Sequence, residues 1–281
     1  MSHHHDSISS RDFSRVSKLI YREAGIHLGT EKVTMLEARI KRRLKALDLD
    51  SYERYCDYLF SETGLGNEVV PLIDVVTTNK TDFFREAKHF DFLVERALPD
   101  LLSHDRNGRP MSLWSAGCST GEEPYTLAIV LSEYAKTHPG FRFKILGTDI
   151  STTVLARAAV GVYSSEVVQA VNPVLRRKYF MRSRDPLSGE ERAVPELRHA
   201  VEFRRLNFMD ADYGITEKVD AIFCRNVIIY FDRPTQERIL LNLSHCLVPG
   251  GYMFVGHAES LHDMNLPLIS VAPALYRRIS G

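Results

Sequence analysis

The 281-residue sequence has few cysteines, no long apolar run and no excess of charge. Its four cysteines (Cys56, Cys118, Cys224 and Cys246) lie far apart and form no CxxC pair, which argues against a disulfide framework or a zinc site. Lysine plus arginine and aspartate plus glutamate both number 36, so no global charge indicates a nucleic acid or a membrane surface as partner. No stretch is apolar over the roughly 20 residues that a membrane helix needs, and the N-terminus lacks a signal-peptide core. We therefore expect a cytoplasmic protein that is not inserted in a membrane; the consecutive histidines at 3–5 are assigned no function.

The first quarter of the chain has the pattern of helices. Apolar side chains recur at helical spacing around Phe13 to Ile20, Leu36 to Leu47, Tyr55 to Leu59 and Val69 to Ile73. Gly25, Gly29, Gly64 and Gly66 are expected to separate these helices. With no β-pattern in this stretch, residues 1–76 are expected to form a small all-α domain.

One predicted helix of this domain is unusually basic. Arg39, Lys41, Arg42, Arg43 and Lys45 fall within seven residues of one another. In a chain of zero net charge this is a local basic patch. It is either a solvated helix face or a docking surface for an acidic partner, to which it would supply electrostatic steering.

The chain alternates between strand and helix patterns from residue 111 onward. Strand-like runs are at 111–114, 142–147, 201–206, 221–224, 252–256, 269–271 and 274–276, and helical runs are at 125–136, 153–159, 234–246 and 260–264. This alternation predicts a mostly parallel sheet with helices on both faces, closed by an antiparallel hairpin at one edge.

Residues 172–200 interrupt the alternation. Turn-forming dipeptides such as Asn172-Pro173 and Asp185-Pro186 flank two short strand-like runs, at 179–181 and 192–194. We expect an inserted β-subdomain here, which either overhangs the active-site edge and selects a partner or is an exposed insertion without function.

A glycine turn follows the first predicted strand, in the stretch WSAGCSTGEEPY (114–125). Gly117 and Gly121 permit close approach of a ligand to the backbone, as in the nucleotide-binding turns of α/β sheets. Glu122 and Glu123 would repel a pyrophosphate but suit hydroxyl groups or a cation. The turn therefore favours S-adenosylmethionine over NAD or ATP; the alternative is an ordinary turn whose acids interact with the helix dipole.

Polar residues follow the other predicted parallel strands, where ligands of open α/β sheets bind. Asp149 is placed to accept hydrogen bonds from both ribose hydroxyls. Asp149 or Ser151 could instead cap the next helix, and the two roles can coexist. Asn207 offers both a donor and an acceptor to adenine, on which Phe208 could stack.

The pair Arg225-Asn226 comes directly after a buried run and needs partners. A ligand carboxylate suits Arg225; an ion pair with Glu122 or Asp149 is the alternative. The connector at 77–86, rich in hydrogen-bonding groups, is either part of a site at the domain junction or a linker capped by Thr81 or Asp82.

Five segments of the sequence carry a specific resemblance. They read TTNKTDFFREAKHF (77–90), WSAGCSTGEEPY (114–125), GTDIS (147–151), AIFCRNVIIYFD (221–232) and PGGYMFVGHAESL (249–261). In order and spacing the chain closely resembles the CheR family, the bacterial chemotaxis receptor glutamate methyltransferases, over nearly its whole length.

This resemblance implies an α/β fold with a Rossmann-like, S-adenosylmethionine-dependent methyltransferase domain at 91–281, which carries the inserted β-subdomain. The all-α domain precedes it, and a connector at 77–90 joins the two and contributes to the cofactor site. It implies S-adenosylmethionine as methyl donor, S-adenosylhomocysteine as product, no metal, and receptor glutamate side chains as acceptors. The implied cofactor contacts are Asn79, Thr81, Arg85, Glu123, Asp149, Asn207, Phe208, Arg225 and Asn226. Arg85 and Tyr230 match positions near the transferred methyl group.

Two partner surfaces are also implied by the resemblance. The basic helix, with Arg39, Arg42 and Arg43, matches the region that docks the cytoplasmic helices of methyl-accepting chemoreceptors. The inserted subdomain matches the place where some members hold a receptor C-terminal peptide, although the stretch 182–192 departs from those members.

Competing functions remain at this point. A nucleic-acid adenine methyltransferase would carry an Asn/Asp-Pro-Pro-Tyr/Phe motif where this chain has Arg225-Asn226-Val227-Ile228. The helical domain and the insertion favour a macromolecular acceptor over a small-molecule one. A non-catalytic cofactor sensor would bind S-adenosylmethionine without turnover.

Overall fold

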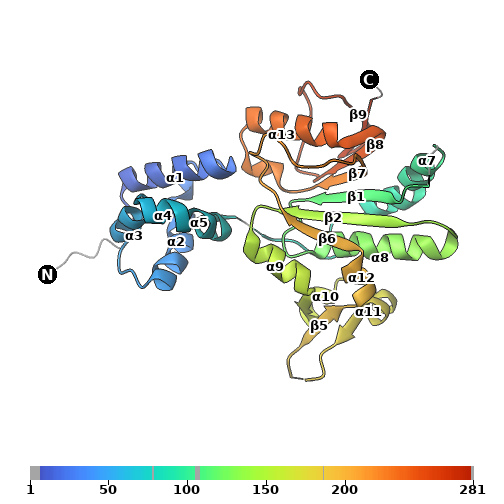
Figure 1. The fold of residues 1–281 in the computed structure, drawn as a ribbon, viewed down its shortest axis with the longest axis horizontal. Coiled ribbons are helices and arrows are strands. Elements are labelled where there is room, and N and C mark those ends of the chain that lie inside the picture. Colours follow the sequence, from blue (N-terminus) through green and yellow to red (C-terminus); the bar gives the residue numbers. More distant parts are fainter. Residues whose placement is uncertain (1–6, 78, 105–107, 186, 280–281) are drawn as a thin grey trace.

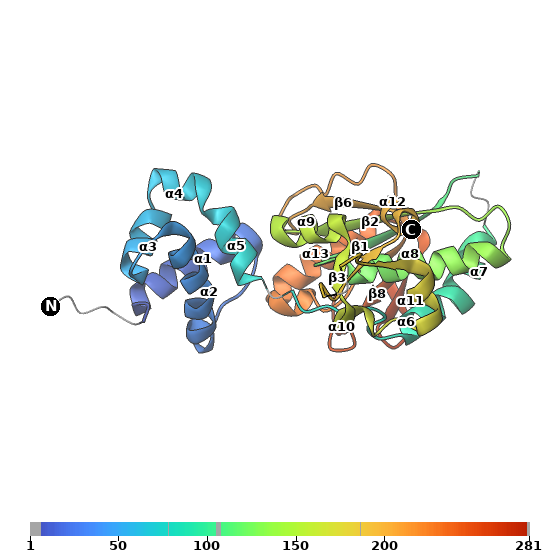
Figure 2. The same ribbon diagram turned by 90° about the horizontal axis from the view of Figure 1, so that it is seen from below.

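The computed structural model describes residues 7–77, 79–104, 108–185 and 187–279. Two bodies lie side by side, a helical N-terminal domain and a larger α/β domain, joined by the connector (Figure 1, Figure 2). The histidines at 3–5, Thr78 of the connector and Pro186 of the insertion lie outside the described residues. Over the described ranges, none of the helices has the length and apolar character needed to cross a membrane.

The N-terminal domain is all-α. Its helices are α1 (Ser10–Ala24), α2 (Val33–Leu47), α3 (Tyr52–Leu59), α4 (Glu62–Asn67) and α5 (Val69–Val76), with the 3₁₀ turn η1 (Thr30–Lys32) before α2. Residues from four of these helices, including Val16, Ile40, Leu59 and Leu72, make one buried core.

Helix α4 was missed by the sequence analysis, which placed Gly64 and Gly66 between helices; both lie within α4. Gly64 is required there because a Cβ atom would lie 1.8 Å from the carbonyl oxygen of Tyr58. This glycine thus serves close helix packing. Gly25 does end α1 as expected, with φ of 71°.

The α/β domain contains a seven-stranded sheet in the order β6-β2-β1-β7-β8-β10-β9. The strands are β1 (Met111–Ala116), β2 (Phe143–Asp149), β6 (Val201–Arg205), β7 (Val219–Cys224), β8 (Leu247–Val255), β9 (Leu268–Ala272) and β10 (Leu275–Arg278). The first five are mutually parallel and β10 is antiparallel to both of its neighbours. The predicted parallel sheet with an antiparallel edge is confirmed.

Helices cover both faces of this sheet (Figure 1). Side chains of β1 alternate between two apolar layers: Leu113 packs in the layer that holds α8 (Glu122–Thr137), and Trp114 packs in the layer that holds α13 (Arg233–Cys246). The first of these layers also receives α6 (Lys88–Phe92), the π-helix η2 (Leu93–Ala97) and α7 (Leu98–Leu102). Helix α9 (Thr152–Val160) follows β2.

The helix expected at 260–264 is absent, because these residues form turns and irregular backbone. Burial of Leu261 in the α13 layer, together with the Glu259 contacts described below, holds this segment in a non-helical path.

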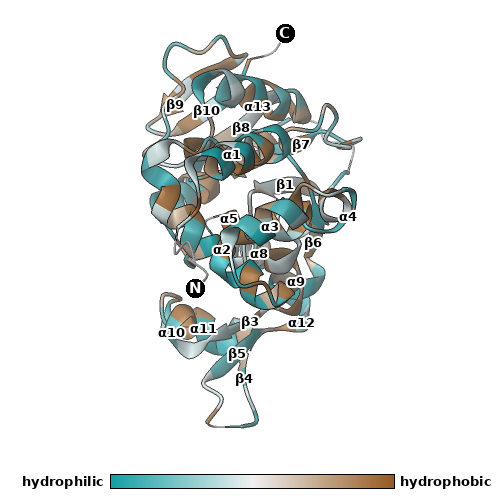
Figure 3. Ribbon diagram, turned by 90° about the vertical axis from the view of Figure 1, so that its left-hand side faces the viewer, coloured by the Kyte–Doolittle hydropathy of each residue, from teal (hydrophilic) through white to brown (hydrophobic). Residues whose placement is uncertain are grey.

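The insertion contains a three-stranded antiparallel sheet in the order β3-β5-β4, which projects away from the main sheet (Figure 1, Figure 3). Its strands are β3 (Val162–Ser164), β4 (Phe180–Arg182) and β5 (Glu190–Ala193), and it carries the short helices α10 (Ser165–Val168), α11 (Pro173–Tyr179) and α12 (Pro195–His199). The expected start at about 172 is too late, because β3 pairs with β5. A strand of three residues is too short to show a period-2 pattern.

Candidate functional site

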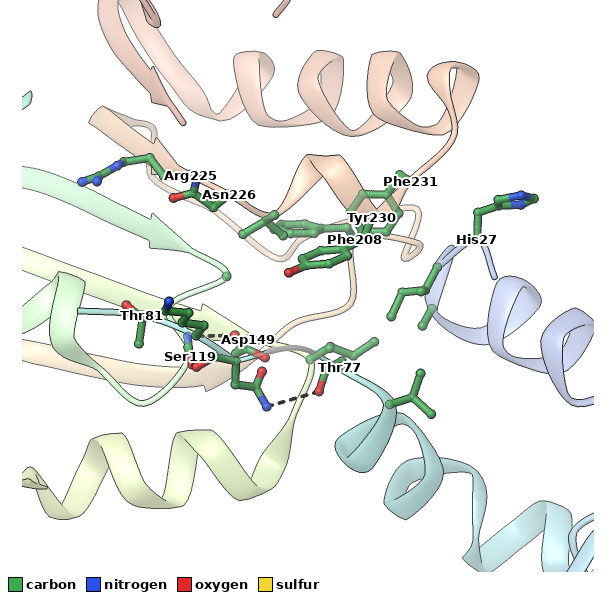
Figure 4. A pocket seen from close by; sticks show the side chains of 18 of the residues that line it. His27, Thr77, Thr81, Ser119, Asp149, Phe208, Arg225, Asn226, Tyr230 and Phe231 are labelled. Carbon is green, nitrogen blue, oxygen red and sulfur yellow. Dashed lines mark hydrogen bonds between the residues drawn. The ribbon is translucent and has the colours of Figure 1, made fainter. Parts of the chain in front are cut away.

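A cavity of about 490 Å³ lies where the helical domain meets the C-terminal ends of the parallel strands (Figure 4). All ten residues assigned to the cofactor or to catalysis line it: Asn79, Thr81, Arg85, Glu123, Asp149, Asn207, Phe208, Arg225, Asn226 and Tyr230. They come from the connector and from the ends of four different strands or the segments that follow them. The fold therefore gathers into one cavity what the sequence spreads over some 150 residues.

Asp149, at the end of β2, holds the glycine turn in place through a hydrogen bond to its backbone. Its carboxylate is 9% exposed and accepts the backbone N–H groups of Ser119 at 2.9 Å and Ser151 at 3.0 Å. The cap of α9 is Ser151, not Asp149, because the Ser151 side chain accepts the N–H of Val154. Asp149 still borders the cavity and retains acceptor capacity there.

Gly117 lets the turn approach the loop that follows β7. Its φ is 83°, and a Cβ atom at this position would lie 2.5 Å from the Val227 side chain. Any side chain at 117 would therefore strain the backbone and push apart the two loops that border the cavity.

Glu122 and Glu123, adjacent in sequence, have separate environments. Glu123 lines the cavity, accepts the Ser115 hydroxyl at 2.7 Å and lies 3.4 Å from a guanidinium nitrogen of Arg225. Glu122 accepts the Thr120 hydroxyl at 2.7 Å, and burial raises its pKa to about 7. Only Glu123 is placed to meet a ligand.

Arg225 is the buried cation of the site, with 7% of its surface exposed. It forms 3.4 Å ion pairs with Glu123 and Glu86 and donates to the carbonyl oxygen of Arg85. The sequence allowed an ion pair of Arg225 with Glu122 or Asp149 as an alternative. An ion pair is present, but its partners are Glu86 and Glu123. Its Nε and Nη1 atoms have no hydrogen-bond partner among the described residues. Buried donors of this kind are normally satisfied, so Arg225 has capacity for a further acceptor such as a ligand carboxylate.

Glu259 holds the loop after β7 in shape and was not singled out from the sequence. Its carboxylate accepts the backbone N–H groups of Asn226 and Val227 at 2.8 Å, Ile228 at 2.9 Å and Gly256 at 2.6 Å. Asn226 has a positive φ of 59°, which this set of bonds maintains. The only sequence signal was an acid inside the segment at 249–261, with nothing to show which backbone it would bind.

The helical domain is fastened to the loops that border the cavity. The side chain of Asn207 donates to the Glu23 carbonyl at 2.6 Å, and the Tyr230 carbonyl accepts the His27 N–H at 3.1 Å. Asn207 also accepts the Met209 N–H at 3.0 Å, so part of its hydrogen-bonding capacity is already used by the protein. The two predicted site residues therefore also set the position of the helical domain.

A second set of hydrogen bonds joins the helical domain to the start of α9, close in sequence to Asp149. The Asp74 carboxylate accepts the Thr152 N–H at 3.0 Å and the hydroxyls of Thr152 and Thr153 at 2.9 Å each. Helix α9 begins at Thr152, three residues after Asp149. Asp74 of the helical domain therefore stabilises the start of this helix through complementary charge and direct hydrogen bonds.

The connector is part of the site and not a capped linker. The next helix, α6, begins at Lys88 without a side-chain cap, so neither Thr81 nor Asp82 caps it. A guanidinium nitrogen of Arg85 donates to the Lys80 carbonyl at 3.1 Å, and the Asn79 carbonyl accepts the Ser119 hydroxyl at 3.1 Å. These bonds tie the connector to itself and to the glycine turn.

The three predicted docking arginines lie on α2, away from the cavity, and they differ in role. Arg43 is turned inward, where its guanidinium binds both oxygens of Glu68 at 2.7 and 2.8 Å. Glu68 is 1% exposed and also accepts the Tyr55 hydroxyl at 3.0 Å. Arg43 therefore neutralises a buried acid, a role that the sequence did not suggest for it. Arg42 is exposed and Arg39 is half-buried.

The α/β domain, preceded by an all-α domain, belongs to the class of methyltransferase domains that bind S-adenosylmethionine. Residues 79–273 match the family described as CheR methyltransferase, SAM binding domain, and residues 11–77 match CheR methyltransferase, all-alpha domain. The chain therefore belongs to the CheR methyltransferase family.

Curated relatives agree with this assignment. Chemotaxis protein methyltransferase 2 of Pseudomonas aeruginosa is 41% identical over 265 residues, covering 94% of this chain and 92% of the relative. The chemotaxis protein methyltransferase of Salmonella typhimurium is 41% identical over 258 residues, covering 92% and 86%. That of Borreliella burgdorferi is 37% identical over 276 residues, covering 97% and 95%.

Proposed function

We propose that this chemotaxis protein methyltransferase transfers the methyl group of S-adenosylmethionine to glutamate side chains of chemoreceptor cytoplasmic helices, forming methyl esters for sensory adaptation and leaving S-adenosylhomocysteine. The observation that carries the proposal is the convergence of ten assigned residues on one cavity, in a chain that matches chemotaxis methyltransferases over nearly its full length.

The chemistry of the cavity fits the cofactor. Asp149 is proposed to accept the ribose hydroxyls, and Asn207 with Phe208 to hold the adenine. Arg225 and Asn226 are proposed to bind the carboxylate, since Nε and Nη1 of the buried Arg225 have no hydrogen-bond partner among the described residues. Glu123 suits the ammonium group, and Asn79 and Thr81 complete the contacts from the connector.

Methyl transfer to a carboxylate needs alignment more than proton transfer. A glutamate acceptor is ionised at neutral pH and already nucleophilic, so no general base is required. Holding the reacting atoms about 3 Å apart and in line contributes roughly 7–11 kcal/mol. Arg85 and Tyr230, which line the cavity, are proposed to orient the acceptor, and the helical domain to exclude water from it.

The acceptor is proposed to reach the cavity along the basic helix α2. Arg42 and Lys41 are exposed there, with Arg39 half-buried beside them, and they would attract the acidic methylation region of a receptor. A receptor C-terminal peptide at the inserted sheet is a further proposed contact. No nucleic acid is expected as partner.

The decisive experiment supplies labelled S-adenosylmethionine and receptor cytoplasmic fragments, and then treats the product with mild alkali. We expect label on receptor glutamates that is released as volatile methanol, the behaviour of a methyl ester. Alkali-stable label would indicate a different acceptor atom. Cofactor binding without any labelled product, across a panel of receptors, would support a sensor instead.

A further inference from the structure

Next to Arg225, which lines the cavity, lies a cluster of three side chains of metal-ligating type that the proposed reaction does not use. Glu86 belongs to the connector, His89 to α6, and His257 to the loop after β8, and their ligand atoms all lie within 4.8 Å of one another. We propose that Glu86, His89 and His257 form a binding site for a divalent transition-metal ion such as Zn²⁺.

The first support is unsatisfied hydrogen-bonding capacity. His89 is 1% exposed, yet among the described residues neither of its ring nitrogens has a hydrogen-bond partner. Glu86 Oε2 likewise has no hydrogen bond within the described ranges, although it forms an ion pair with Arg225. The nearest approach between them, from His89 Nδ1 to Glu86 Oε2, is 3.5 Å. Buried polar atoms are normally satisfied by protein, water or an ion, and a metal would take a lone pair from each residue.

The second support is the chemistry of the donor set. Two imidazoles and one carboxylate are the protein ligands of many zinc sites that keep a fourth position open. His257 is exposed, which provides an entry path and leaves the fourth position to solvent.

The third support is that only small movements are needed. Ligand atoms around a tetrahedral Zn²⁺ lie roughly 3.4 Å apart, and the ligand atoms here are already within 4.8 Å. The exposed His257 side chain can close this difference by rotation, and its ring already lies 5.0 Å from that of His89, centroid to centroid.

Arg225 sets the expected strength of binding. Its guanidinium lies 3.4 Å from Glu86 Oε2 and opposes a second cation, whereas Glu123 on its other side offsets part of that charge. We therefore expect an affinity in the micromolar range, weaker than that of a structural zinc site. Glu86 would be shared between the metal and Arg225. A metal bound here would contradict the expectation, drawn from the sequence, that the protein holds no metal.

The test is calorimetric titration of Zn²⁺ into the full-length protein after treatment with a chelator and dialysis. His3, His4 and His5 are replaced by alanine in every protein compared, since a run of imidazoles binds the same ions. We expect one ion per chain, with His257→Ala weakening the affinity at least ten-fold. His262→Ala, which alters an exposed histidine a few residues away, should bind as the parent does.

Glu86→Gln provides a second variant that keeps the size of the side chain and should also weaken binding at least ten-fold. Folding of each variant is checked by its circular dichroism spectrum. Absence of one-to-one binding in the parent, or equal affinities for the His257→Ala and His262→Ala proteins, would overturn the proposal. Neither result depends on methyl transfer, so the proposed function is tested separately.

Discussion

Glu259 accepts the backbone N–H of Asn226 at 2.8 Å, and the two residues thereby join the loops after β7 and β8. Three more backbone N–H groups bind the same carboxylate. Asn226 and its neighbour Arg225 both line the cavity. The shape of the proposed carboxylate-binding loop therefore depends on an acid that itself does not line the cavity.

Replacing Glu259 by glutamine should therefore damage cofactor binding at a distance. The amide would turn one acceptor into a donor that faces N–H groups, and bonds to charged acceptors contribute roughly 1.5–3 kcal/mol each. We expect Glu259→Gln to weaken S-adenosylhomocysteine binding about ten-fold or more and to lower the unfolding temperature. Calorimetry and thermal unfolding measure both. Glu95→Gln removes an exposed glutamate and should change neither; full cofactor affinity in Glu259→Gln would show that the loop does not need this acid.

Asp149→Asn tests the proposed ribose contact with little change of shape. Asparagine can still accept one of the two backbone N–H groups that Asp149 binds, but it loses the charge. The loss of charge-assisted hydrogen bonds, about 1.5–3 kcal/mol, corresponds to roughly 10–100-fold weaker cofactor binding. Titration with S-adenosylhomocysteine measures this, with the exposed Asp263→Asn as control. An unchanged dissociation constant would remove the ribose role.

Arg85→Ala should separate turnover from cofactor binding. Arg85 lines the cavity, and a guanidinium nitrogen bonds the Lys80 carbonyl at the far side of the connector turn. If it orients the acceptor, kcat should fall about 100-fold, as expected for lost alignment, while the cofactor dissociation constant changes much less. Arg96→Ala, at an exposed position, should retain activity. Equal losses in turnover and in cofactor affinity would contradict the positioning role.

Arg43 and Arg42 are adjacent but should respond in opposite ways. Arg43→Ala leaves the buried Glu68 carboxylate without its cation, which typically costs about 3–5 kcal/mol of stability. Arg42→Ala at the exposed position should change stability by no more than about 0.5 kcal/mol. We expect Arg42→Ala instead to slow receptor methylation at low salt, with the difference disappearing at high salt.

Thermal unfolding and methylation assays on the two proteins distinguish these roles. Glu68→Gln in the Arg43→Ala background should recover part of the stability, because the unpaired charge is then removed. A stable Arg43→Ala protein that fails only in methylation would restore Arg43 to the docking surface.

Local patterns predicted the seven-stranded sheet well because each of its strands carries its own apolar run and turn signals. The same reasoning placed Asp149 and Arg225 at strand ends, which the parallel topology then brings to one edge. The ion pair of Arg43 with Glu68 and the bonds of Glu259 to Asn226 could not be predicted. Each joins side chains or loops far apart in sequence, and no local pattern specifies which charged residue of a group faces inward.

Glu122 should make stability depend on pH. Burial raises the pKa of this carboxyl from 4.5 to about 7 in the folded protein, so the folded state holds its proton more tightly than the unfolded chain. Its contribution to stability is fully present below about pH 4.5 and is lost as the pH rises through about 7. The shift corresponds to at most about 3 kcal/mol.

Glu122→Gln keeps the shape and the bond to the Thr120 hydroxyl but cannot ionise. We expect this variant to unfold at a higher temperature than the parent above about pH 7, and at nearly the same temperature below about pH 4.5. Thermal unfolding across this range measures the difference, with Glu166→Gln, an exposed glutamate in the first turn of α10, as control. Because Glu122 does not line the cavity, cofactor affinity should persist in the variant. Identical pH dependences of the unfolding temperature for parent and Glu122→Gln would mean that ionisation of Glu122 costs no stability.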